Sequence, residues 1–139
     1  MSFGWSGGDI FAITQLAANV YTAYKDAPND YKNIAEEVKS LESIINQAAQ
    51  HLKSTTLSEH QQTGQEILGG CRSVLEDLNS YIKEYKSVAS TSRRLNFRRV
   101  KVGTEDIAKL RSRLTSNTIL LSTFIQGFDI HTTTIYYIC

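Results

Sequence analysis

The sequence predicts an all-α fold, an antiparallel four-helix bundle, and three observations support this fold class. Hydrophobic residues recur at alternating spacings of three and four in four long segments joined by short links. Proline occurs once, at Pro28, and turn clusters are few, which argues against a many-stranded β fold. A chain of 139 residues is long enough to form one core without covalent cross-links. We therefore expect four helices that alternate in direction around one core.

The first expected helix covers residues 7–25 and has no charged residue between Ile10 and Tyr24. Its apolar stripe consists of Ile10, Ile13, Ala17, Val20 and Tyr24. Phe11, Leu16 and Tyr21 widen the apolar surface, and a helix that is apolar over most of its circumference is typical of a central, buried position. The uncharged run is shorter than the roughly 20 residues needed to cross a bilayer. It therefore predicts a core helix or an interfacial helix.

The second expected helix follows Pro28, a residue that suits the first turn of a helix. Its stripe is Tyr31, Ile34, Val38, Leu41, Ile45, Ala48 and Leu52. The third expected helix begins at Ser58, and its stripe is Ile67, Cys71, Val74, Leu78, Tyr81, Tyr85 and Val88. Gly64, Gly69 and Gly70 interrupt the first half of this helix. Close approach of a neighbouring helix is the favoured explanation, and fraying of the first half is the alternative.

A basic run separates the third expected helix from the last one. Residues 90–103, STSRRLNFRRVKVG, contain no acidic residue and five basic ones, Arg93, Arg94, Arg98, Arg99 and Lys101. We expect a loop and then a short extra helix near Arg93 to Lys101. Thr104 caps the last long helix, whose stripe is Ile107, Leu110, Leu114, Asn117, Leu121, Phe124 and Phe128. The bundle domain is thus expected over residues 1–128, followed by a non-helical, β-prone tail over 129–139.

No residue pattern indicates catalysis or a bound cofactor. His51, His60 and His131 lack the spacing of a metal site, so we expect no catalytic, cofactor or metal residues and no small-molecule substrate. Cys71 lies on an apolar stripe, which favours a buried and inert thiol. With Cys139 as the only other cysteine, the sequence suggests no disulfide framework and predicts a reducing, cytoplasmic location.

The basic run has two interpretations. The favoured one is a solvated connector that faces the acidic residues of the third expected helix. The functional one is a patch for anionic lipid headgroups, formed by Arg93, Arg94, Arg98, Arg99 and Lys101. A nucleic-acid partner is not expected, because the net charge is only +1 and no nucleic-acid-binding motif accompanies the run.

Several short motifs resemble those of a known family. They are Gly8-Asp9-Ile10, Tyr24-Lys25-Asp26-Ala27-Pro28, Gly70-Cys71-Arg72-Ser73-Val74-Leu75, and Asp106-Ile107 with Leu110, Arg113-Leu114 and Asn117. In their order and spacing, from about Ser2 to Phe128, the chain resembles the fungal N-terminal domain of STAND (NLR-like) proteins. This family of HeLo-like helical bundles is also named after azaphilone pigment cluster protein L.

The resemblance implies an effector or signalling module whose first helix attacks membranes when the domain oligomerises and induces cell death. That role would fall on Phe3, Trp5, Ile10, Phe11, Ile13, Leu16, Val20 and Tyr21. It also implies a cytoplasmic protein that relocates to a membrane. The alternative is a soluble module, or a truncated receptor remnant, that pairs with a helical partner or with itself and has no membrane activity. Replacing Ile13 and Leu16 with Glu distinguishes the membrane-active module from the soluble one. The substitutions would unfold the domain only if these residues belong to the core.

Overall fold

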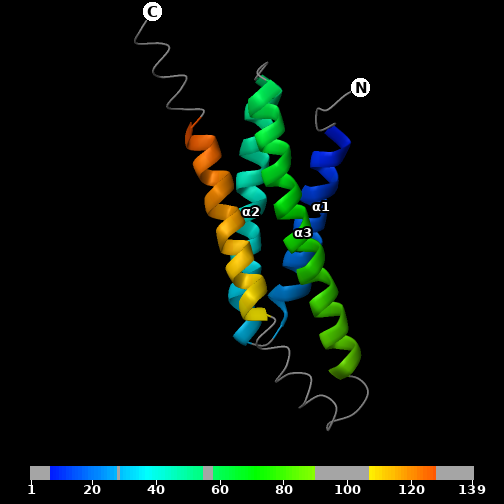
Figure 1. Cartoon of the computed structure of the whole chain (residues 1–139). Helices are drawn as coiled ribbons and strands as arrows, with labels where there is room; N and C mark the ends of the chain where they lie inside the picture. The colour runs from blue at the N-terminus through cyan, green and yellow to red at the C-terminus, as the bar shows by residue number, and fades with distance from the viewer. Residues whose placement is uncertain (1–6, 28, 55–57, 90–106, 128–139) are drawn as a thin grey trace, which may run out of the picture.

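The computed structural model describes residues 7–27, 29–54, 58–89 and 107–127, and these residues form four helices without a strand (Figure 1). The helices are α1 (Gly7–Lys25), α2 (Asn29–Ser54), α3 (Ser58–Ala89) and one over residues 107–127, which we call the 107–127 helix. Each helix runs antiparallel to the one before it in the sequence (Figure 1). The predicted all-α fold class is therefore confirmed.

The 107–127 helix and α1 lie on opposite sides of α2 and α3 (Figure 1). α1 packs chiefly against α2 and also against α3, whereas α2 and α3 contact each other less. Arg111 and Arg113 connect the 107–127 helix to α2 and α3 through ion pairs with Glu37 and Asp77. Because α1 and α3 are separated in sequence by one helix, these two neighbours run in the same direction (Figure 1).

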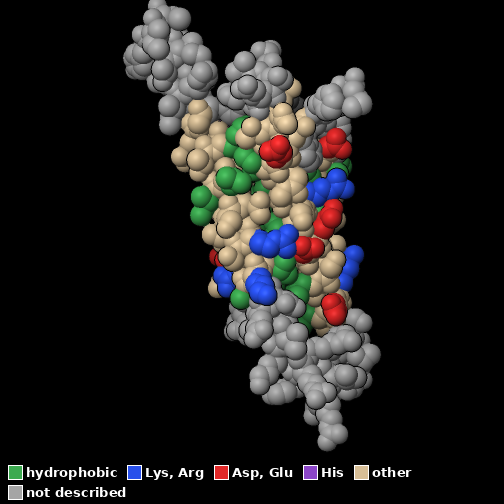
Figure 2. Space-filling view, viewed as in Figure 1, with side chains coloured by type: hydrophobic (Ala, Val, Ile, Leu, Met, Phe, Trp, Pro, Cys, Tyr) green, Lys and Arg blue, Asp and Glu red, His purple; other side chains and the backbone are tan. Residues whose placement is uncertain are grey.

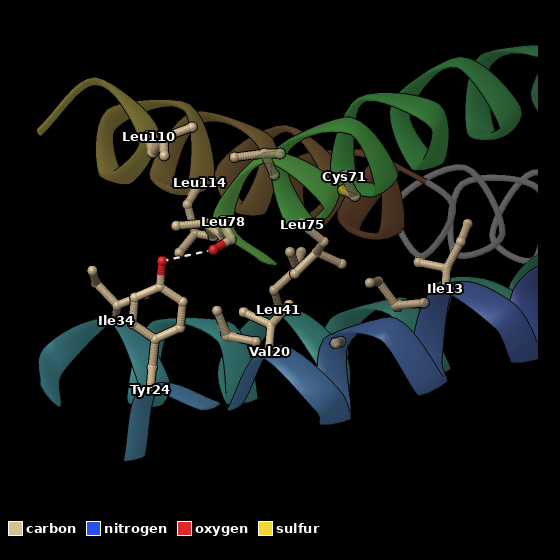
Figure 3. Close-up of a cluster of buried hydrophobic side chains, with 14 of the residues drawn as sticks. Ile13, Val20, Tyr24, Ile34, Leu41, Cys71, Leu75, Leu78, Leu110 and Leu114 are labelled. Carbon is tan, nitrogen blue, oxygen red and sulfur yellow. Dashed lines mark hydrogen bonds between the residues drawn. The ribbon is translucent and has the colours of Figure 1, made fainter. Parts of the chain in front are cut away.

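The core lies along the bundle axis, where all four helices contribute buried side chains (Figure 3). Every buried side chain in the described part of the chain is hydrophobic. The Tyr24 hydroxyl donates a hydrogen bond of 2.8 Å to the carbonyl oxygen of Leu78, which joins α1 to α3 inside this core. Removing such apolar surface from water stabilises the fold by about 25 cal/mol per Å².

The structure differs from the sequence-based expectation for α1. A single stripe is buried, with Ile13 only 1% exposed and Val20 fully covered, whereas Phe11 is 69% exposed. Leu16 and Tyr21 are half-buried against the edge of the core. α1 is thus a peripheral helix covered on one side, and not the central helix that its composition suggests. The reason is that α2 and α3 are the neighbours that bury it, and both lie on the same side.

The buried face of α3 is wider than the predicted stripe. Residues 67, 71, 74 and 78 are buried as expected, but Leu68, Leu75 and Ile82 are buried too. Tyr81 and Tyr85, which were expected to continue the stripe, are half-buried at its edge. α3 packs against α1 on one side and against the 107–127 helix on another, so two adjacent stripes are needed to fill both contacts.

The predicted short helix near Arg93–Lys101 and the predicted tail over 129–139 lie outside the described residues. Two explanations were considered for the glycines in the first half of α3, close approach of a neighbouring helix and fraying. α3 is one continuous helix from Ser58 to Ala89, so its first half is helical. A methyl group on Gly64 would lie 2.8 Å from a Leu52 side-chain carbon and 3.2 Å from the Phe124 ring. Close approach of neighbouring helices is therefore confirmed at Gly64.

Gly69 and Gly70 are adjacent but differ in their surroundings. A Cβ atom on Gly70 would lie 2.6 Å from Asn117 Oδ1, whereas one on Gly69 would meet nothing within 4 Å. Asn117 is also held in place by a hydrogen bond of 2.8 Å from its Nδ2 to the carbonyl oxygen of Arg113. Helix packing therefore explains Gly70, and nothing in the structure explains Gly69.

This contrast makes a testable pair of variants. Gly69→Ala is expected to stabilise the domain by about 1 kcal/mol, because alanine favours a helix interior. Gly70→Ala should be at least about 1 kcal/mol less stable than Gly69→Ala, because Asn117 must leave its position and its hydrogen bond. Urea unfolding followed by circular dichroism measures both. Equal stabilisation by the two substitutions would show that the 107–127 helix does not pack against Gly70.

Candidate interaction surface

The residues predicted to form a membrane-active helix do not share one exposed face. Ile13 and Val20 belong to the core, Ile10, Leu16 and Tyr21 are half-buried, and Phe11 is exposed. Phe3 and Trp5 lie outside the described residues. In this arrangement Ile13 and Val20 can contact a lipid surface only if α1 leaves the bundle.

The predicted lipid patch, Arg93, Arg94, Arg98, Arg99 and Lys101, lies outside the described residues as well. Within the described ranges, no helix is sufficiently long and apolar to cross a membrane. The same ranges contain no group of three or more His, Cys, Asp or Glu side chains that could hold a metal ion. The described helices thus offer neither a membrane span nor a metal centre.

The one cysteine in the described helices is not placed for nucleophilic chemistry. Cys71 is fully buried, and this burial raises the pKa of its thiol to about 12. The thiol is therefore protonated at neutral pH, whereas the thiolate is the form that reacts. The expectation of a buried thiol is confirmed at this position.

Four tyrosines from α1, α2 and α3 form an aromatic cluster near the turn between α1 and α2. Tyr31 makes edge-to-face contacts with Tyr24, Tyr81 and Tyr85, with ring centroids 5.4–6.5 Å apart. The hydroxyl groups of Tyr31 and Tyr81 are 3.2 Å apart and share a hydrogen bond. Burial, with a smaller contribution from Tyr31, raises the pKa of Tyr24. The cluster fastens three helices together.

Charged residues are distributed unevenly along the bundle axis. One half combines the start of α1, the end of α2, the start of α3 and the end of the 107–127 helix (Figure 1). We call it the charge-poor half and define it as residues 10–18, 43–52, 60–71 and 114–127, in which Glu66 is the one Asp, Glu, Lys or Arg. Asp9, Lys53 and Glu59 border these ranges. The other half holds the helix-linking ion pairs. This separation is a property of the fold, because four distant stretches of sequence meet there.

The ion pairs of the charged half tie the 107–127 helix to its neighbours. Arg111 binds Glu37 of α2 through two nitrogen–oxygen contacts, of 2.6 and 3.5 Å, which raise the pKa of its guanidinium group. Arg113 binds Asp77 of α3 at 2.6 Å and the Ser73 hydroxyl at 3.2 Å. All three basic residues of this helix lie in its first two turns. In its second half, Leu121 and Ile125 are buried in the core.

The large hydrophobic side chains that the described structure exposes all lie in the charge-poor half. Ile119 is 60% exposed and Leu120 is 52% exposed, and they are adjacent on the outer face of the 107–127 helix. Phe11 lies on α1, across the bundle from them. Figure 2 shows hydrophobic side chains on the charge-poor half, beside the 107–127 helix, with few acidic or basic groups around them. Ile119 and Leu120 form the candidate interaction surface.

Ile119 and Leu120 were not among the predicted site residues, although two features of the sequence point to them. Both lie off the predicted stripe of Leu114, Asn117 and Leu121, with Ile119 on the opposite face and Leu120 on the flank beside it. They also lie within an uncharged run that extends from residue 114 to 127. A solvent-facing helix side normally carries charged residues, so an uncharged run with apolar residues off the stripe indicates a second contact surface.

Comparisons with known proteins do not assign the chain to a family. No family model matches it, and neither a curated protein nor a solved structure matches it significantly.

Proposed function

We propose that this chain is a helical protein-interaction module that uses its charge-poor half to contact another protein. The observation that carries this proposal is the exposed pair Ile119 and Leu120 on a bundle whose own core is already filled. These side chains do not contribute to the core of their own chain. Burying the exposed half of each side chain against a partner would contribute about 1 kcal/mol per side chain.

The chemistry of this surface favours a protein partner over other classes of ligand. A phosphate-rich or anionic lipid surface is bound by basic side chains, and residues 114–127 contain none. Hydrophobic side chains within a polar, uncharged surround are typical of surfaces between proteins. The Ser, Thr, Asn and Gln side chains around the pair can supply hydrogen bonds at the rim of such a contact.

The resemblance to the N-terminal domain of fungal STAND proteins suggests the biological setting. We propose a signalling role in a cytoplasmic NLR-like system, in which contact between helical domains passes on the signal. This setting rests on the motifs quoted above, and the interaction surface rests on the geometry. The two can be tested separately.

A membrane-targeting, cell-death activity through α1 is the second candidate. It is favoured by the exposed Phe11 side chain and by the absence of charge between Ile10 and Tyr24. This activity would require α1 to separate from α2 and α3, because Ile13 and Val20 are buried between them. Separation would expose this stripe to water unless a membrane received it at the same time.

Sedimentation of the full chain with vesicles distinguishes the two candidates. Vesicles of phosphatidylcholine, alone or mixed with phosphatidylserine, are incubated with the wild type, Phe11→Glu and Asn19→Glu. Asn19 is also exposed on α1, so it provides a matched control for the added charge. The interaction module is expected to remain in the supernatant in every case.

Pelleting with vesicles would contradict the interaction module. If Phe11→Glu abolished pelleting and Asn19→Glu did not, the membrane activity of α1 would replace it. If both variants pelleted but an Arg93→Glu, Arg94→Glu double variant did not, the basic run would be the lipid-binding element instead. Circular dichroism of each variant confirms that the helices are intact.

A further inference from the structure

The glycines of α3 divide this helix into two unequal parts. Gly64, Gly69 and Gly70 all precede Cys71, and glycine is the least favourable residue in a helix interior after proline. Packing accounts for Gly64 and Gly70, but a Cβ atom on Gly69 would meet nothing within 4 Å. Gly69 therefore weakens the helix at a position where alanine would fit. We call Gly69 and Gly70 the glycine pair.

After the glycine pair, polar and aromatic contacts join α3 to all three other helices. Leu78 accepts a hydrogen bond from α1, and Asp77 binds the 107–127 helix. Tyr81 and Tyr85 make edge-to-face contacts with α2. These contacts fix residues 77–85 from three sides, so this part of α3 can move only if several of them break together.

Burial is distributed over the two parts of α3 in the same sense. Between residues 61 and 70 the buried hydrophobic side chains are Ile67 and Leu68. The part after the glycine pair buries Cys71, Val74, Leu75, Leu78 and Ile82. Uncoiling the first part would therefore remove fewer side chains from the core than uncoiling the second.

We propose that residues 58–69 of α3 uncoil locally, up to the glycine pair, while residues 71–89 remain packed in the bundle. This conformational device goes beyond the proposed function, which does not require it. Local opening would uncover Leu52 and Phe124, the side chains nearest to Gly64. Both belong to the charge-poor half, so the open form presents more apolar surface there than the closed form does.

Cys71 can report this opening, because it is fully buried and directly follows the glycine pair. In the full chain with Cys139→Ser, Cys71 is the one thiol. Its alkylation by iodoacetamide is followed by mass spectrometry at increasing urea concentrations. Local opening exposes little surface, so the labelling rate should change little at low urea. Labelling through global unfolding would instead rise steeply with urea from the start.

Two exposed positions of α3 provide matched substitutions in this background. Gly69→Ala should slow labelling about fivefold at low urea, because alanine stabilises the coiled form of the first part. Lys83→Gly weakens the second part by nearly the same change in helix propensity. It should leave the rate at low urea unchanged, because residue 83 is helical in both the closed and the open form.

Three results would overturn the proposal. The first is a labelling rate that follows global unfolding at every urea concentration. The second is a rate that Lys83→Gly raises by about as much as Gly69→Ala lowers it, which would show that α3 opens as one unit. The third is a rate that Gly69→Ala leaves unchanged, which would mean that a movement elsewhere in the bundle exposes Cys71. Circular dichroism verifies that both variants are folded.

Discussion

Glutamate at position 13 is expected to unfold the domain, whereas glutamate at position 11 leaves it folded. Ile13 is 1% exposed, so Ile13→Glu would lose the apolar contacts of the isoleucine and bury a carboxylate that has no described partner. An unpaired charge in a core costs several kcal/mol, and domains are usually stable by only about 5–15 kcal/mol. Circular dichroism at neutral pH should show most of the helical signal lost for Ile13→Glu.

The control for this prediction lies two residues away on the same helix. Phe11 is 69% exposed, so Phe11→Glu should keep the helical signal and change the free energy of unfolding by less than about 0.5 kcal/mol. Urea titration compares the two variants with the wild type. A folded Ile13→Glu protein would mean that α1 is not packed into the core. It would also favour the membrane-active interpretation of this helix.

The second large effect concerns the attachment of the 107–127 helix. Leu114 is 1% exposed and belongs to the shared core, whereas Leu120 is 52% exposed on the same helix. Leu114→Ala should lower the free energy of unfolding by about 2–5 kcal/mol, because it removes buried methyl groups and leaves a cavity. Leu120→Ala should change it by less than about 0.5 kcal/mol, because its side chain is largely solvated in the monomer.

The free energy of unfolding of Leu114→Ala and Leu120→Ala is measured at low protein concentration, where association between molecules does not contribute to stability. Equal and small effects at both positions would show that the 107–127 helix is not an integral member of the bundle. Equal and large effects would show that Leu120 is covered by its own chain. In that case Ile119 and Leu120 could not serve as an interaction surface.

The fold was predictable from sequence because helical periodicity reports which side of a helix is buried. Ile34, Val38, Leu41 and Ile45 recur at the predicted spacing, and all four are fully covered in the structure. Periodicity does not report how many neighbours a helix has. This explains why α3 buries more residues than its predicted stripe and why α1, although nearly all apolar or small, is covered on one side alone.

The candidate surface was less predictable than the fold. Exposure of Ile119 and Leu120 depends on where the 107–127 helix faces, and this follows from contacts between residues far apart in sequence. Arg111 meets Glu37 across 74 positions and Arg113 meets Asp77 across 36. The membrane-active site predicted for the first helix assumed that its apolar side chains are accessible. Ile13 and Val20 are instead buried in the core. The predicted basic patch falls outside the described residues and stays a prediction.

The two ends of the 107–127 helix are held by forces that respond oppositely to dissolved salt. Its start is tied by Arg111 and Arg113 through partly exposed ion pairs, and ionic strength screens such pairs. Its second half is held by the packing of Leu121 and Ile125, which excluded salts such as sulfate strengthen. Added sulfate therefore strengthens the packing of the second half, whereas at the start it has two opposing effects, because Ile107 and Leu110 are buried there beside the ion pairs.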